Sequence, residues 1–336
     1  MVRISILPAL SVSTGVSTFD AELWNMIKHF PYADRFALYG EWKESTCTAS
    51  GEYPCLVACQ AAESALNQTK DVLKRVVAPD SSTGSTAIVD RGPARTLARI
   101  SHSNPHKLWE RAVFQVKTYS NIGQFIVDAG RYMGQLSTDV ATFVLLDELS
   151  SNKLKRVDQH GKTAEPLENI ATFLGDFNRR YLTMELEPVL QFVHNRLLAS
   201  QSVDLIIVDK LVSIMSGVSP IENNAISDDQ LRALSSGVHL NHEAFHATTI
   251  TIPRPIDPTD PNAKSKQTPM DKNKSTKKSL PRLVDSLRDP VFGIPIWISL
   301  AQTWQDALQA AGAQATKTTA EKLDSVSQVS LPGLPA

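Results

Sequence analysis

Apolar residues recur along most of the chain at intervals of three and four, the spacing that places side chains on one face of an α-helix. The stripes comprise Leu56, Cys59, Leu66, Leu73 and Val76; Leu108, Trp109, Ala112, Val113 and Val116; Ile122, Phe125, Ile126, Ala129 and Met133; Val140, Phe143, Val144 and Leu149; Ile170, Phe173, Leu174, Phe177 and Tyr181; Leu186, Val189, Leu190, Val193 and Leu197; and Leu205, Val208, Leu211, Val212 and Met215. The segments are about 12–18 residues long with short connections between them, which is typical of antiparallel helix pairs.

The apolar stripe of each predicted helix is too wide for one neighbouring helix to cover, so the helices must stack side by side. The sequence therefore predicts an all-α fold, an α-solenoid of stacked antiparallel helix pairs of the HEAT-like kind. No repeat of fixed period is visible in the sequence, so the prediction depends on packing alone. Two β-branched runs, at 203–208 and 248–252, lack partner strands of similar strength and do not change it.

Two segments interrupt the helical pattern. Residues 78–93 hold prolines and glycines and predict an exposed loop. Further on, four prolines between Pro253 and Pro261 are followed by six lysines, which predicts a solvated, disordered insertion. We expect five segments in all: an N-terminal extension at 1–18, a helical repeat array at 19–237, the Pro/Lys-rich insertion at 238–279, closing helices at 280–312 and a disordered tail at 313–336.

Composition narrows the class of protein. The 336 residues suit two ordinary domains or one extended helical array, and 42% hydrophobic residues exclude wholesale disorder. A net charge of −1 argues against a uniformly basic nucleic-acid binder, and the 15 glycines form no glycine-rich phosphate loop. An odd set of three cysteines, Cys47, Cys55 and Cys59, favours a reducing compartment over a disulfide framework.

The chain shows no signal of membrane targeting. The apolar run before Pro8 is too short for the core of a signal peptide. No stretch approaches the roughly 18 apolar residues that a membrane helix needs. We therefore expect a soluble intracellular chain without a membrane partner.

Charge is segregated along the chain. Residues 70–111 carry eight bases against four acids, whereas 139–187 carry nine acids against six bases. Arg91, Arg95 and Arg99 recur every four residues and are expected on one helix face. Such a face suits protein partners or a phosphate backbone, although a merely solvated helix face is an equally simple interpretation.

One motif suggests metal chemistry. His242, Glu243 and His246 fit the H-E-x-x-H pattern, in which two histidines one helical turn apart bind zinc and the glutamate acts as general base. The β-branched residues and Pro253 that follow do not suit the long helix that such a site needs, and no histidine follows 246. Coincidental surface histidines are therefore the favoured interpretation, with a zinc metalloprotease as a remote alternative. His194 lies beside an apolar position and is expected to be structural; we expect no catalytic residue, metal or cofactor.

Several stretches resemble a known family. They are Phe30-Pro31-Tyr32 with Arg35 and Tyr39-Gly40-Glu41-Trp42-Lys43, Thr69-Lys70-Asp71-Val72-Leu73-Lys74-Arg75, Ala98-Arg99-Ile100-Ser101-His102-Ser103-Asn104-Pro105, Tyr119-Ser120-Asn121, and Leu136-Ser137-Thr138-Asp139-Val140. Together they are similar to the largest subunit of the THO complex, over about 19–304. The chain departs from the family pattern at 42–54 and 238–279.

The resemblance implies an α-helical scaffold similar to the middle domain of translation-initiation scaffolds, and a chain that corresponds to part of a longer nuclear protein. It implies three kinds of partner: other THO subunits, a DEAD-box RNA helicase that the scaffold docks and stimulates, and mRNA, bound directly or indirectly. We expect exposed side chains at helix ends to make these contacts, with Arg91, Arg95, Arg99, Lys107 and Trp42 as candidates. A module that binds RNA directly, through these arginines and the lysines of 264–278, is the alternative.

Overall fold

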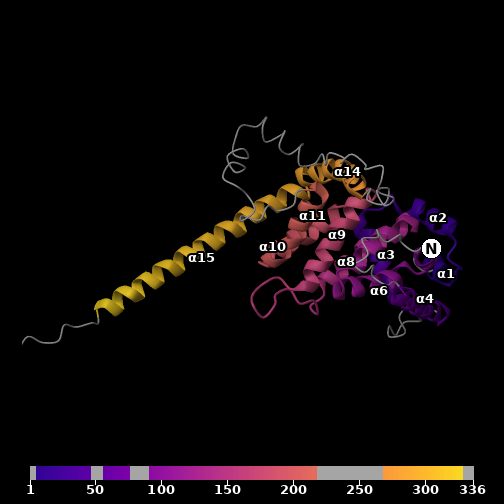
Figure 1. Cartoon of the computed structure of the whole chain (residues 1–336), viewed down its shortest axis with the longest axis horizontal. Coiled ribbons are helices and arrows are strands. Elements are labelled where there is room, and N and C mark those ends of the chain that lie inside the picture. Colours follow the sequence, from indigo (N-terminus) through magenta and orange to yellow (C-terminus); the bar gives the residue numbers. More distant parts are fainter. Residues whose placement is uncertain (1–4, 47–55, 76–90, 218–267, 328–336) are drawn as a thin grey trace, which may run out of the picture.

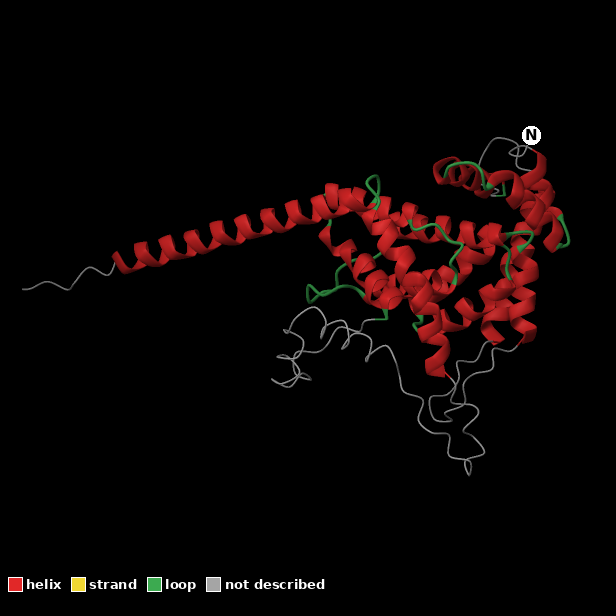
Figure 2. Ribbon diagram, turned by 90° about the horizontal axis from the view of Figure 1, so that it is seen from above, coloured by secondary structure: helices red, strands yellow, loops and turns green. Residues whose placement is uncertain are grey.

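The computed structural model describes residues 5–46, 56–75, 91–217 and 268–327. Within these ranges every regular element is a helix, and the only strand-like feature is an isolated bridge between Val157 and Thr163 (Figure 2). The all-α prediction is confirmed.

The helices follow one another in the order of their labels in Figure 1. The first group is α1 (Leu7–Val12), α2 (Ser17–Ile27), α3 (Tyr32–Ser45), α4 (Leu56–Arg75), α5 (Arg91–Ser101), α6 (Pro105–Thr118), α7 (Ile122–Ala129) and η2 (Gly130–Tyr132). The second group is α8 (Gln135–Ser150), α9 (Glu165–Arg180), α10 (Glu187–Leu198), η3 (Ser202–Leu205), α11 (Ile206–Ser216), α14 (Thr268–Arg288) and α15 (Gly293–Ser327).

Local sequence explains where many helices begin and end. Proline occupies the first turn of α1, α6, α9 and α10, where its missing N–H breaks no helical hydrogen bond. Helix α11 ends at Gly217, whose φ of 72° lies in the left-handed region that glycine adopts without strain. Helix α9 carries acids in its first turn and bases in its last, which complements the helix dipole.

Helix α6 occupies the centre of the array and packs against α8 and α9. Trp109 of α6 is fully buried, and its ring lies 5.3 Å from that of Phe177 and 6.5 Å from that of Phe173. Its indole N–H donates to the Ser137 hydroxyl of α8 at 3.0 Å. The same apolar stripes that predicted the helices therefore meet in one continuous core.

The helices stack side by side from α1, α2 and α4 at one end to α10 and α15 at the other, so the predicted solenoid is confirmed (Figure 1). Helix α9 packs against α11, and α11 packs in turn against α14. Helix α15 begins against α10 and then projects from the body as a long single helix. Among the described residues, no helix combines the length and apolar character that crossing a membrane requires.

Three segments differ from the structure expected for them. Residues 5–18 are more than an extension, because Leu7 and Leu10 of α1 are buried in the core. Helix α14 begins at Thr268, inside the segment predicted to be disordered up to 279, and α15 continues to Ser327, well past 312. Lysine, alanine and glutamine are good helix formers, so composition that suggested disorder is compatible with helix.

Other expectations stay untested. Residues 78–90 of the predicted loop, 218–237 of the array and 238–267 of the insertion lie outside the described residues, as does the run at 248–252. The division of the chain into five segments remains a prediction.

Candidate interaction surface

A buried ionic cluster joins α3 to α8. Arg35 of α3 is 1% exposed, and its guanidinium donates from Nε to Oδ2 of Asp139 at 2.9 Å and from Nη2 to Oδ1 at 3.2 Å. The Tyr39 hydroxyl, one turn along α3, donates to the same carboxylate at 2.8 Å. Arg35 also donates to Glu185 at 2.6 Å and to the carbonyl of Phe30 at 2.8 Å. One side chain therefore fixes α3 against two segments that are far away in the sequence.

The electrostatics of this cluster follow from burial and pairing. Burial by itself would lower the pKa of the Arg35 guanidinium, but the hydrogen bonds and charges of Asp139 and Glu185 raise it. For the Asp139 carboxyl burial has the opposite effect and raises the pKa. The hydrogen bonds from Arg35 and Tyr39 and the charge of Arg35 oppose this rise. The pKa of Tyr39 is raised by burial and by the charge of Asp139. Arg35 is thus held in its charged form and Tyr39 in its neutral form, which suits a structural ion pair.

Trp42 lies in the core and not on the surface. It is 1% exposed, and its indole N–H donates to the Ser11 hydroxyl of α1 at 2.8 Å. The Ser11 carbonyl accepts from the Asn104 side chain at 2.9 Å, so α1, α3 and the turn before α6 are joined. The expectation that Trp42 is an exposed contact residue is therefore wrong. Burial of its large ring removes apolar surface from water and stabilises the fold.

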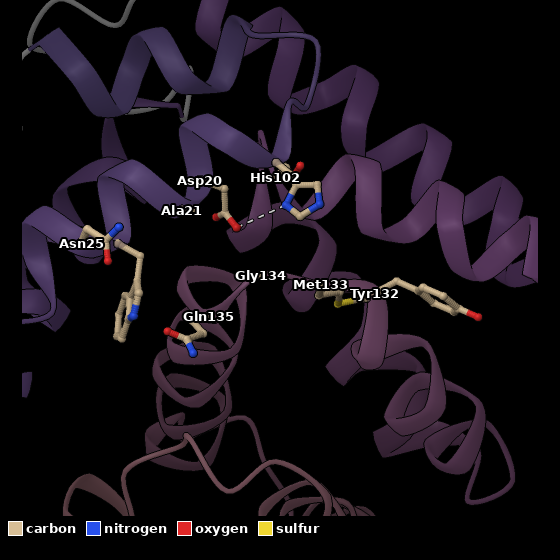
Figure 3. A pocket seen from close by; sticks show the side chains of 10 residues that line it. Asp20, Ala21, Asn25, His102, Tyr132, Met133, Gly134 and Gln135 are labelled. Carbon is tan, nitrogen blue, oxygen red and sulfur yellow. Dashed lines mark hydrogen bonds and ion pairs between the residues drawn. The ribbon is translucent and has the colours of Figure 1, made fainter.

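A second polar pair links α2 to the turn that follows α5. Nδ1 of His102 lies 3.2 Å from Oδ2 of Asp20, and both side chains are buried (Figure 3). The pair borders a cavity of about 310 Å³ that Trp24 and Gln135 also line. Gly134, just before α8, is required here, because a Cβ at this position would overlap the Asp20 carboxylate. Asp20 thereby lies at the N-terminus of α8, where its negative charge complements the helix dipole.

His106, in the first turn of α6, is a further buried polar residue. Its Nε2 lies 2.9 Å from the Thr46 hydroxyl, and its ring centroid lies 5.0 Å from that of Trp42. Burial, followed by the charges of Lys107 and Lys43, lowers the pKa of His106 to about 3. The imidazole is therefore neutral near neutral pH, as expected for a packing residue.

The sequence motifs singled out above thus supply side chains that join helices. Sequence reasoning named Arg35 and Asp139 only as part of the family resemblance and did not foresee that they pair. It did not name Asp204, which is buried and binds both Arg156 and Arg196. The signal that could have found them is a charged residue at a position that the apolar periodicity assigns to the core. His194 was predicted to be structural, and its Nδ1 lies 3.2 Å from the Ser299 hydroxyl of α15.

The arginine face has the predicted helical setting. Arg91, Arg95 and Arg99 all belong to α5, and the side chains of Arg95 and Arg99 are exposed one turn apart. Neither makes an ion pair with another described residue. Lys107 differs, because its side chain is only 13% exposed and pairs with Glu110 at 3.2 Å. The structure therefore leaves Arg95 and Arg99 as the available members of the predicted set.

His242, Glu243 and His246 lie outside the described residues, so the structure does not test the zinc motif. In the ranges that the structure describes, no group of three or more metal-ligating side chains comes together.

The fold and these sites define a class: an α-helical array whose buried polar side chains join helices and whose basic residues face outward on α5. Two family models match the chain: one described as THO complex subunit 2 N-terminus covers residues 1–83, and one described as Transcription- and export-related complex subunit covers 97–171. Over these two ranges the chain is similar to THO complex subunit 2.

Individual proteins named THO complex subunit 2 are similar to most of this chain. THO complex subunit 2 of Homo sapiens is 28% identical over 298 residues, which cover 88% of this chain and 16% of the relative. The Arabidopsis thaliana protein of the same name is 27% identical over 323 residues, covering 95% of this chain and 16% of the relative. That of Saccharomyces cerevisiae is 23% identical over 245 residues, or 73% of this chain and 14% of the relative. The chain thus spans about one sixth of the length of the curated relatives it matches.

Proposed function

We propose that this chain is a non-enzymatic scaffold segment of a THO complex, which acts in the nucleus in mRNA processing and export. The similarity of the chain to THO complex subunit 2 carries the proposal. The fold supports it, since a stack of helices presents a broad outer surface to partners. The proposed partners are other THO subunits, a DEAD-box RNA helicase that the scaffold docks and stimulates, and mRNA.

Within this proposal, Arg95 and Arg99 contact a partner, with Arg91 as the third residue of the same helix. Both side chains are exposed, and neither is neutralised by a described acid. A guanidinium can pair a carboxylate or phosphate with two parallel hydrogen bonds, so two of them one turn apart suit an acidic protein surface or a nucleic-acid backbone.

The test is the double substitution Arg95→Glu/Arg99→Glu. Its matched control is Lys153→Glu/Lys155→Glu, which makes the same change in charge at two exposed lysines after α8. We expect the arginine variant to weaken helicase binding at least about tenfold in a reconstituted complex, and to reduce the stimulation of its ATPase, while the control does neither. Unchanged helicase binding and unchanged RNA binding would exclude this surface.

The alternative, direct binding of RNA, is favoured by the same exposed arginines. Salt separates the two functions: affinity for RNA falls steeply between about 50 and 200 mM salt, because counterions are released from the phosphates. A contact between these arginines and an acidic protein surface also weakens with salt, but less steeply, because no condensed counterions are released from a phosphate backbone. RNA affinity that is lost in the arginine variant and depends strongly on salt would support the RNA-binding function.

A further inference from the structure

A cavity of about 310 Å³ lies between one face of α2 and the segment that joins η2 to α8 (Figure 3). Ser17, Ala21 and Gln135 line it and are exposed, so they form its rim. Asp20 also lines it, but its side chain is only 3% exposed and therefore lies at the inner end. Ligand pockets span about 300–1,000 Å³, so this cavity suits a single side chain better than a nucleotide.

Asp20 presents to this cavity a carboxylate with one oxygen unpaired. Its Oδ2 lies 3.2 Å from Nδ1 of His102, whereas Oδ1 is buried and has no hydrogen-bond partner among the described residues. The N-terminus of α8 complements the negative charge, but none of its N–H groups forms a hydrogen bond with Oδ1. Burying an acceptor without a donor costs free energy, so a ligand that brings a donor to Oδ1 removes this cost on binding.

The surroundings of Oδ1 favour a donor that is positively charged. Among the described residues, Asp20 is the only acid that lines the cavity, and no lysine or arginine lines it. The Arg35 guanidinium lies 5.6 Å from the ring centroid of Trp24, another lining residue, and it pairs with two acids, Asp139 and Glu185. This neighbouring cluster therefore adds negative charge rather than positive. Hydrogen bonds to an ionised partner are about twice as strong as neutral ones, so a cation gains most here.

Two bases contact lining residues without lining the cavity themselves. Lys28 donates to Oδ1 of Asn25 at 3.0 Å, and the Arg131 guanidinium lies 5.6 Å from the centroid of the Tyr132 ring. Both bases are exposed, so water and salt screen their charge. The Asp20 carboxylate is therefore the charge that decides which ligand enters.

A guanidinium fits this lining better than an ammonium. It is less strongly hydrated and its plane packs on aromatic side chains, and both Trp24 and Tyr132 line the cavity. It also has five N–H donors, so one can pair with Oδ1 of Asp20 while others meet the Ser17 hydroxyl and the Gln135 amide at the rim. An ammonium has three donors around a single nitrogen and cannot span these acceptors as widely.

We propose that the cavity binds the side chain of an arginine that a partner protein presents. Its guanidinium pairs with Oδ1 of Asp20, and its aliphatic stem lies against Trp24. Ser17 and Ala21, which are small and lie one turn apart at the rim, leave room for the backbone of the partner. The site is distinct from the arginine face of α5, so it goes beyond the function proposed above and does not depend on it.

Titration of the full chain with N-acetyl-arginine amide, followed by the NMR signal of the Trp24 indole N–H, tests the chemistry of the site. We expect saturable binding with a Kd of about 1–10 mM, the range of a single small ligand. N-acetyl-citrulline amide, which keeps the shape but loses the charge, should bind at least about tenfold more weakly, and N-acetyl-lysine amide should also bind more weakly. The absence of saturable binding, or a citrulline or lysine compound that binds as tightly as the arginine compound, would overturn the proposal.

Variants of the full chain test the place of binding. Ala21→Phe fills the cavity from its exposed rim, leaves the buried pair of Asp20 and His102 intact, and should weaken arginine binding at least about tenfold. The matched control is Ala33→Phe, at an exposed alanine of α3 that does not line the cavity, and it should bind as the wild type does. Asp20→Asn should weaken binding to the same degree as Ala21→Phe, with circular dichroism to establish that it is folded. Wild-type affinity in Ala21→Phe, or equal losses in Ala21→Phe and Ala33→Phe, would contradict this site.

Discussion

Arg35 illustrates how single residues organise this array. Its guanidinium binds Asp139, which lies 104 positions further along the chain, and Tyr39 donates to the same carboxylate. A buried ion pair contributes little net stability compared with well-packed apolar residues, but loss of one partner leaves the other charge buried and unpaired. The pair therefore fixes which segments meet more than it adds free energy to the fold.

Replacement of Arg35 by methionine should lower the free energy of unfolding by about 3–5 kcal/mol, because the Asp139 carboxylate stays buried without its partner. Tyr39→Phe is the matched control. It removes one hydrogen bond but keeps the ion pair, and should cost only about 1 kcal/mol. Urea unfolding followed by circular dichroism measures both, and equal effects of the two substitutions would refute this assignment.

His106 makes stability depend on pH. Its pKa is about 3 in the folded chain and about 6.5 when unfolded, so below pH 6.5 the unfolded state binds the proton more readily. The contribution of His106 to the free energy of unfolding is fully present above pH 6.5 and is lost as the pH drops toward 3. At about pH 5 the loss amounts to about 2 kcal/mol.

The comparison that isolates His106 is wild type against His106→Gln, unfolded with urea at about pH 7.5 and about pH 5. The wild type should lose about 2 kcal/mol more than the variant between these conditions. The raised pKa of Asp139 acts in the opposite direction, but it is common to both proteins and cancels. An identical pH dependence in the two proteins would show that His106 is not buried as a neutral group.

At the scale of elements, α14 is fastened to α9 by one side chain. Arg282 of α14 donates to the carbonyls of Asn178 at 2.7 Å, Tyr181 at 3.0 Å and Met184 at 3.1 Å. These carbonyls lie in the last turn of α9 and just beyond it, where helical partners are lacking and a positive charge is favourable. Burial lowers the pKa of Arg282 to about 10, so the guanidinium is still charged at neutral pH.

Arg282→Leu should release α14 and the start of α15 locally, because the α9 carbonyls lose their donors at a cost of roughly 1–3 kcal/mol. Hydrogen exchange should become faster across 278–300 and stay unchanged in α6 at the centre of the array. Arg288→Leu, at the exposed end of α14, should have no such effect. Uniformly faster exchange throughout the chain would mean that α14 is instead part of the global folding unit.

At the scale of the whole molecule, the buried apolar residues of nearly all described helices form one continuous core, as expected of stacked helices rather than of two separate domains. Large apolar side chains are exposed at both ends of the stack: Phe19 and Met26 of α2 at one end, and Trp304 and Leu308 of α15 at the other. Charged side chains are exposed as well, including Arg95 and Arg99 of α5. The array thus exposes both apolar and charged side chains to partners.

Part of the interaction surface could be predicted from the sequence. Arg95 and Arg99 alternate with the buried Ala94, Leu97 and Ala98 of the same helix, so their exposure follows from helical periodicity alone. Trp42 could not be assigned in this way. Its exposure depends on whether α1 covers it, and a tryptophan suits both a core and an interface.

The sequence by itself determined that the chain is all-α and where most of its helices lie, because apolar periodicity, prolines at helix starts and helix propensity act between near neighbours. Only the tertiary structure decided that Arg35 meets Asp139, that Asp20 approaches Gly134, and that α15 leaves the body with one apolar face free. Contacts of this kind join residues distant in sequence. Their energy depends on the packing of the helices between them, which no local pattern encodes.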